Sequence, residues 1–202
     1  AQIRLVYDLP IVTSTAHNIT MLKYNDQLYS QVGTALGSIF PNSTAKYHRI
    51  PVGSNKVDAY KGAAKDVLAY TSNFTIEKGK WSAFIYQESQ PPLLVQDPEE
   101  YETGHPWADT LTYVRFVNLF HKADGVTPYG RLTLKVQRVV DGANQWVDVA
   151  TCDYKEASTY NPIKLNRKGI AIWSGTETAM IFALFDANGT QLQHCATSSA
   201  SV

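Results

Sequence analysis

The densest cluster of side chains that could do chemistry lies at residues 99–109. His105 and Asp109 stand four positions apart in it. Three carboxylates precede them: Glu99, Glu100 and Glu102. An imidazole beside carboxylates can act as a general base or bind a metal ion, but both roles need side chains that rigid elements hold in place. The stretch is rich in proline, so we expect a solvated linker in which Trp107 docks on a domain.

The rest of the chain shows no catalytic, metal-binding or phosphate-binding motif. None of the other four histidines has a second histidine two residues away or a glutamate three residues before it. No serine stands in a nucleophile elbow, and residues 33–37, which begin and end in glycine, lead into no Lys-Ser or Lys-Thr pair. The sequence therefore predicts no catalytic residue, no metal site and no cofactor.

Charge and hydrophobicity narrow the function classes. The formal net charge is zero, so the basic footprint of a nucleic-acid-binding protein is missing. No run of 18 apolar residues exists, so no membrane-spanning segment is predicted. Two cysteines, Cys152 and Cys195, fall in the second half. They form a disulfide if the protein is extracytoplasmic, or they are two buried free thiols.

The chain contains one succession of segments twice. The matching pairs, in chain order, are residues 3–6 with 114–117, 22–24 with 134–136, and 47–60 with 160–173. Their separations are 111, 112 and 113 residues, so the two copies need only single-residue insertions to align. A period of this length suits a whole domain rather than a solenoid repeat. We interpret the pattern as a tandem duplication of one domain.

The repeated segments carry the pattern of β-strands. Val57 and Ala59 alternate with charged residues, as in a strand with one buried and one solvated face. Because a Pro-Val-Gly-Ser-Asn turn precedes them, residues 47–60 are predicted to form a hairpin. Short strands separated by turns, in units of about 100 residues, favour an immunoglobulin-like antiparallel β-sandwich in each half. A barrel is the alternative.

Composition sets the expected domain boundaries. We expect an N-terminal β-sandwich at residues 1–96, a linker rich in proline and acidic residues at 97–109, and a C-terminal β-sandwich at 110–202. The first half ends on two strands at residues 74–86 that the second half does not repeat. Residues 191–202 read as a polar tail. The second sandwich is therefore expected to close its sheet differently or to lack its last strand.

Three of these segments follow loose motifs. Residues 114–121 (VRFVNLFH) open on a hydrophobic-Arg-hydrophobic-Val strand, residues 47–60 contain a Tyr strand before a Pro-x-Gly turn, and residues 74–86 place Gly-Lys before an aromatic strand. Together they resemble a tandem extracytoplasmic β-sandwich family known only as a domain of unknown function, found in secreted bacterial proteins and in lipoproteins of gut bacteria. Residues 7–10 depart from that family's usual His-Ala-Ser-Pro continuation. The resemblance implies a cell-envelope or external location and a binding role.

These observations favour a non-enzymatic extracytoplasmic protein of the cell surface that acts in adhesion or ligand binding. A linker whose aromatic side chains face outward, rather than dock on a domain, would make Tyr101, Trp107 and the adjacent His105 the candidate ligand-binding residues. A carbohydrate-binding surface module is the alternative, and a hydrolase built on residues 105–109 is a third hypothesis. The expected partner is a protein or glycan ligand. Membrane attachment is expected only through an N-terminal lipid anchor outside this chain.

Overall fold

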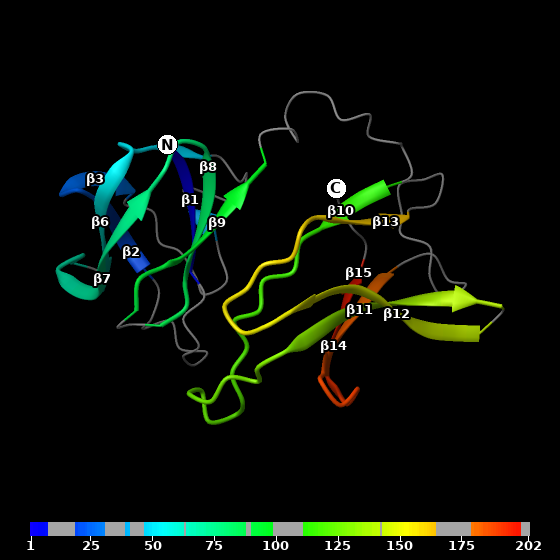
Figure 1. Cartoon of the computed structure of the whole chain (residues 1–202). Coiled ribbons are helices and arrows are strands. Elements are labelled where there is room, and N and C mark those ends of the chain that lie inside the picture. The colour runs from blue at the N-terminus through cyan, green and yellow to red at the C-terminus, as the bar shows by residue number, and fades with distance from the viewer. Residues whose placement is uncertain are drawn as a thin grey trace. The chain divides into compact units, whose positions relative to one another are not determined.

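The computed structural model describes residues 1–7, 19–30, 39–40, 47–62, 64–87, 90–98, 111–141, 143–164 and 179–198. These residues form strands and turns, which confirms the predicted all-β class (Figure 1). Within these ranges there is no helix that could cross a membrane. Contacts between residues divide the chain into two compact units, Ala1–Thr103 and Gly104–Val202. Each unit is described by itself below.

The first unit consists of two sheets. Its strands are β1 (Gln2–Tyr7), β2 (Ile19–Tyr24), β3 (Gln27–Ser30), β4 (Ile39–Phe40), β5 (His48–Arg49), β6 (Gly53–Lys61), β7 (Val67–Ile76), β8 (Lys80–Ile85) and β9 (Leu93–Asp97). One sheet has the order β4-β1-β8-β9, with β5 also on β1, and the other has the order β3-β2-β6-β7. The proline-rich stretch after residue 87 thus still contributes the edge strand β9.

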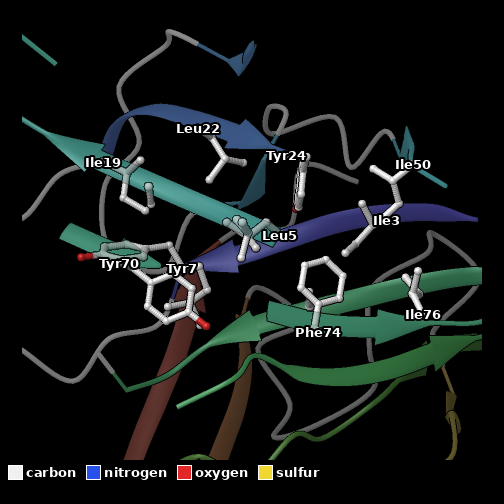
Figure 2. Packing of buried hydrophobic residues seen from close by; sticks show 14 residues of the cluster. Ile3, Leu5, Tyr7, Ile19, Leu22, Tyr24, Ile50, Tyr70, Phe74 and Ile76 are labelled. Carbon is white, nitrogen blue, oxygen red and sulfur yellow. The ribbon is translucent and has the colours of Figure 1, made fainter. Parts of the chain in front are cut away.

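Alternating apolar side chains explain how the two sheets pack into a sandwich. On β1, Ile3, Leu5 and Tyr7 are buried and point into one cluster, which also contains Leu22 and Phe74 of the other sheet (Figure 2). A fully buried Leu or Ile stabilises a fold by about 1.5–3 kcal/mol relative to an exposed one. The core of the first unit therefore lies between its two sheets.

Two features of the first unit differ from the prediction. Strands β1 and β8 are parallel, with Arg4 beside Ser82 and Val6 beside Phe84, so the sandwich is not antiparallel throughout. The predicted hairpin at residues 47–60 is also wrong, because β5 pairs with β1 in one sheet while β6 pairs with β2 and β7 in the other. Alternation reveals which face of a strand is buried but leaves open which strand it pairs with.

The second unit contains a two-stranded and a four-stranded sheet. Its strands are β10 (Leu111–Val114), β11 (Leu132–Val140), β12 (Ala143–Cys152), β13 (Asn161–Lys164), β14 (Ala179–Asp186) and β15 (Gln191–Ser198). β10 pairs with β13, and the larger sheet has the order β12-β11-β14-β15. Phe116 packs with Leu132, Ala150, Cys152 and Leu184 in the core. The polar tail predicted from residue 191 is therefore wrong as far as residue 198, because this segment pairs along β14.

Strand pairing repeats between the two units. Ile3 lies opposite His48 in the first unit, and Val114 lies opposite Asn161 in the second. These pairs keep the separations of 111 and 113 residues found in the sequence. The same register in both units is what a duplication predicts.

The last part of the sequence repeat does not mark equivalent strands. Leu22 of β2 pairs with Ala59 of β6, and Leu134 of β11, which matches Leu22 in the repeat, pairs with Leu184 of β14. β14 thus takes the place of β6, although the repeat aligned β6 with residues 166–174. The match between apolar residues there therefore did not predict which strand takes this place. Residues 165–178 lie outside the described residues.

Candidate functional site

The predicted ligand-binding residues Tyr101, His105 and Trp107 lie outside the described residues, as does Asp109. In the part of the chain that the structure describes, no group of three or more His, Cys, Asp or Glu side chains could hold a metal ion. A site must therefore be sought on the described strands and turns.

A basic pocket is present at one end of β1 in the first unit. Its volume is about 370 Å³. The residues that line it are Ala1, Gln2, Arg49, Ile50, Lys78, Gly79 and Lys80. They come from the start of β1, from β5 and from the turn that connects β7 to β8, so three segments distant in sequence form the pocket.

Backbone hydrogen bonds hold these three segments together. The N–H of Gln2 donates to the carbonyl of Gly79 at 2.9 Å, and the N–H of Ile50 donates to the carbonyl of Ala1 at 3.0 Å. Gly79 has a φ of +134°, and a Cβ at this position would lie 3.0 Å from Nε2 of Gln96. Only glycine adopts this conformation without strain. The Gly-Lys turn therefore fixes the position of Lys78 and Lys80 at the rim.

The lining of the pocket is cationic. Arg49, Lys78 and Lys80 supply three positive charges, and no carboxylate is among the lining residues. Arg49 and Lys78 are exposed, and neither forms an ion pair with a described carboxylate. A guanidinium can bind a carboxylate, sulfate or phosphate through two parallel hydrogen bonds, and an ammonium adds a point charge. The pocket is therefore suited to an anionic group.

A buried polar network supports the strands beside this pocket. Asp97 accepts hydrogen bonds from the hydroxyls of Tyr47 (2.8 Å) and Ser82 (2.6 Å). Nε of Arg4 donates to Ser82 Oγ at 2.6 Å, and its guanidinium lies 3.6 Å from Asp97. The hydroxyl of Ser82 thus donates to one neighbour and accepts from the other. This arrangement ties β1, β8 and β9 together.

An arginine stacks on a tyrosine at the equivalent place in each unit. The Arg4 guanidinium lies 5.2 Å from the centre of the Tyr47 ring, and that of Arg115 lies 4.5 Å from the Tyr160 ring. Such cation–π contacts contribute about 0.5–2 kcal/mol. The repeat contains both members of each pair, but sequence alone did not reveal that they touch. The contact gives a physical reason for the Arg in each opening strand.

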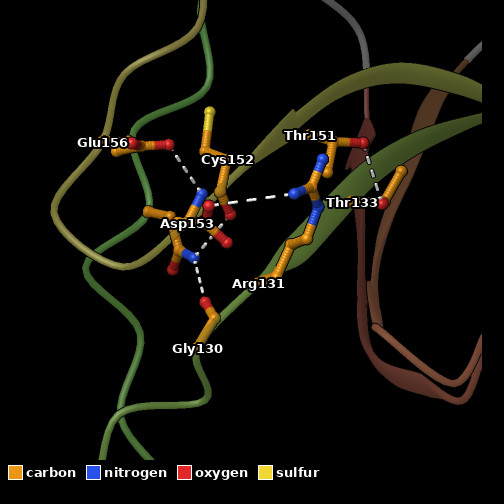
Figure 3. Close-up of polar contacts among 8 residues, drawn as sticks. Gly130, Arg131, Thr133, Thr151, Cys152, Asp153 and Glu156 are labelled. Carbon is orange, nitrogen blue, oxygen red and sulfur yellow. Dashed lines mark hydrogen bonds and ion pairs between the residues drawn. The ribbon is translucent and has the colours of Figure 1, made fainter.

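The polar residues around Cys152 in the second unit have a structural role. Asn118 is fully buried and donates to the carbonyls of Gly130 (2.6 Å) and Cys152 (3.1 Å). Figure 3 shows Asp153 beside Arg131 and Glu156: the ion pair measures 3.8 Å, and the Asp153 N–H donates to Glu156 at 3.0 Å. These contacts join two loops of the second unit.

Cys152 is a buried free thiol. Burial raises its pKa, and the nearby Glu156 carboxylate adds to this effect, so the thiolate is disfavoured. A disulfide with Cys195 is excluded by the sheet order, because β12 and β15 are separated by β11 and β14. Three strand spacings amount to roughly 14 Å, whereas the Cα atoms of a disulfide lie within about 7 Å of each other. Of the two predicted alternatives, a disulfide or buried free thiols, Cys152 is a buried free thiol.

Comparison with known proteins identified no relative of this chain. No protein-family model matches the chain, and neither does any curated protein or solved structure. The resemblance carried by the repeated segments stays a prediction. Sequence reasoning missed the basic pocket because its cations are spread over two distant segments, and the Glu-Lys-Gly-Lys turn at residues 77–80 was the one local signal.

Proposed function

We propose that this chain is a non-enzymatic, extracytoplasmic binding protein of the adhesion type, whose first unit binds an anionic group of its ligand. The observation that carries this proposal is the convergence of Arg49, Lys78 and Lys80 on a pocket with no carboxylate in its lining. The ligand classes with suitable groups are acidic protein segments and glycans that bear carboxylates or sulfates.

The charge distribution supports a local site. The whole chain has no formal net charge, so attraction of anions depends on where cations gather. Charges at a protein surface interact weakly one by one, but several that face one pocket raise the local concentration of a charged ligand. Because salt screens such attraction over about 10 Å at 0.1 M, binding should weaken as the ionic strength rises.

The tandem arrangement supports a binding role as well. In this proposal both units are immunoglobulin-like sandwiches that descend from one duplicated domain, and the shared strand register and the shared Arg–Tyr contact support that origin. Linked binding modules gain affinity when both engage one ligand or one surface. The buried networks serve strand packing, which agrees with a protein that recognises rather than transforms its ligand.

A binding screen with matched variants tests the proposal. The intact chain is screened against acidic and neutral oligosaccharides and against acidic peptides, and the affinity of any hit is measured by calorimetry at low and high salt. The double change Arg49→Ala and Lys78→Ala should weaken binding at least about tenfold, since each charge-assisted hydrogen bond contributes about 1.5–3 kcal/mol. Lys122→Ala, at an exposed residue of the second unit, is the control and should leave affinity unchanged.

The screen also separates the proposal from neutral carbohydrate binding. A module that stacks sugars on Tyr101 and Trp107 would bind neutral glycans, would lose affinity in Trp107→Ala, and would be insensitive to salt and to the Arg49 change. That outcome, or the absence of any acidic ligand, would refute the anionic site.

A further inference from the structure

The described parts of the two units differ at one edge of their opening strand. In the first unit, β1 has β4 and β5 on one edge and β8 on the other. In the second unit, β10 pairs with β13, and Val117 forms a bridge with Ala157, both on the edge that corresponds to β4 and β5. Among the described residues of the second unit, no strand lies on the edge that corresponds to β8.

Backbone hydrogen bonds show which way the groups after β10 point. Phe116 accepts from the N–H of Ser158 at 2.8 Å, and the N–H of Asn118 donates to Glu156 at 2.9 Å. In an antiparallel pair of this kind, the residue between two bonding residues directs its own N–H and C=O to the opposite edge. Val117 therefore presents both groups to the edge that has no described strand.

We propose that this edge is a strand-acceptor site, where an extended segment of a partner polypeptide adds to the sheet parallel to β10. Unpaired strand edges are templates for an added strand, whose main-chain bonds give affinity while alternate side chains give specificity. This site is independent of the basic pocket, which belongs to the first unit.

The first unit shows what chemistry the added strand needs. β8 (Lys80–Ile85) buries Ala83 and Ile85 in the core, while Ser82 lies opposite Arg4 and bonds to it. The repeat places Arg115 at the position of Arg4. The preferred occupant therefore has small or aliphatic residues at alternate positions and a hydroxyl residue opposite Arg115.

A partner strand explains the edge better than a second copy of this chain. In a second copy, β8 already pairs with β1 and β9 on its two edges, so it is not available for donation. Two β10 edges related by a two-fold axis would pair antiparallel, whereas β8 runs parallel to β1. The first unit therefore provides a precedent for a parallel occupant only.

The test uses the intact chain and a peptide with the sequence of residues 77–87, which contains β8. Amide hydrogen exchange is followed by NMR with and without the peptide. We expect slowed exchange at residues 111–118, with one peptide bound per chain. Two N-methylated peptides serve as matched controls, one methylated at Ser82 and Phe84, the other at Trp81, Ala83 and Ile85. Since a strand uses alternate residues toward one neighbour, only one of the two should lose binding.

A variant of the chain sharpens this test. Val117→Pro removes the N–H that faces the edge without a described strand and spares the bonds of Phe116 and Asn118, so peptide affinity should fall about tenfold while circular dichroism stays unchanged. The methylated peptides decide the matter if this variant fails to fold.

Three results would overturn the proposal. The first is slow exchange of Val117 in the free monomer, which would mean that the chain covers its own edge. The second is protection that depends on protein concentration without peptide, which would mean that a second copy binds there. The third is that both methylated peptides bind equally well, or that the unmethylated peptide does not bind at all.

Discussion

The two units begin alike, and their described residues close the fold differently. In both, the opening strand pairs in the same register with the segment around a tyrosine, and in both an arginine stacks on that tyrosine. In the first unit β8 and β9 then extend the sheet beyond β1, whereas the described part of the second unit has no strand in those places. The pairing of the opening strand and the strands that complete its sheet are thus separable features. The same contacts keep the first in both units, whereas the second depends in the first unit on strands late in its sequence.

The largest expected effect is a loss of stability in one unit that leaves the stability of the other unchanged. Leu5 is buried in the first unit and Phe116 is its counterpart in the second. Leu5→Ala should lower the free energy of unfolding of the first unit by about 2–5 kcal/mol, because it leaves a cavity. Residue-resolved hydrogen exchange in denaturant should show the loss in residues 1–98 alone. Phe116→Ala should give the reverse pattern, and loss in both units from either change would show that they do not fold separately.

The second prediction concerns the polar network around Asp97 in the first unit. Asp97→Ala removes the acceptor of Tyr47 and Ser82 and the ion-pair partner of Arg4. Stability of the first unit should fall by about 3 kcal/mol in urea unfolding, since buried donors lose their acceptor. Asp97→Asn keeps one acceptor oxygen and should cost less. Equal stability of Asp97→Ala and the parent chain would show that the network is dispensable.

The sheet order of the second unit makes a prediction about its cysteines. Because β12 and β15 lie at opposite edges of one sheet, Cys152 and Cys195 should remain unlinked after exposure to air. Peptide mapping by mass spectrometry under non-reducing conditions checks this. Cys152 should also react slowly with iodoacetamide in the folded chain and rapidly in denaturant, because burial raises the pKa of its thiol. A linked peptide pair would require a different strand order.

The smallest expected effect is a pH dependence confined to the first unit. Burial lowers the pKa of His48 below its usual value of 6.5, with its ring 4.0 Å from that of Tyr29. In the second unit Asn161 takes its place and cannot titrate. The unfolded chain therefore binds a proton at His48 more readily, so this contribution to stability is present above pH 6.5 and is lost as the pH falls through the lower folded pKa.

An NMR titration measures this directly. The ring protons of His48 should shift at a pH below 6.5, and Tyr29→Ala should bring the pKa back toward that value by opening the ring to solvent. A pKa above 6.5 in the parent chain would contradict the burial argument.

Sequence reasoning succeeded where a pattern is local. Alternation at Val57 and Ala59 indicated a strand, which is β6, and the repeat marked residues 3–6 and 47–60, whose strands pair in the same register in both units. It failed where the outcome depends on partners. Nothing in residues 47–60 distinguishes a hairpin from a crossing between sheets, and a match of apolar letters aligned β6 with residues 166–174 although β14 occupies its place.

The basic pocket could not be predicted from a local sequence pattern for the same reason. Arg49 and Lys78 become neighbours only because β1 joins β5 on one side and the turn before β8 on the other. The predicted aromatic site at Tyr101 and Trp107 rested on exposure expected of a linker, and it stays a prediction.

The parallel contact of β1 with β8 also bears on the order of events during folding. Arg4 and Ser82 are 78 residues apart in the chain, whereas β2 and β3 are joined by a two-residue turn and β6 and β7 follow each other directly. Contacts between distant residues form slowly, because the chain loses much entropy before they are made. During synthesis on a ribosome, β1 can therefore pair with β8 only after most of the first unit has been synthesised.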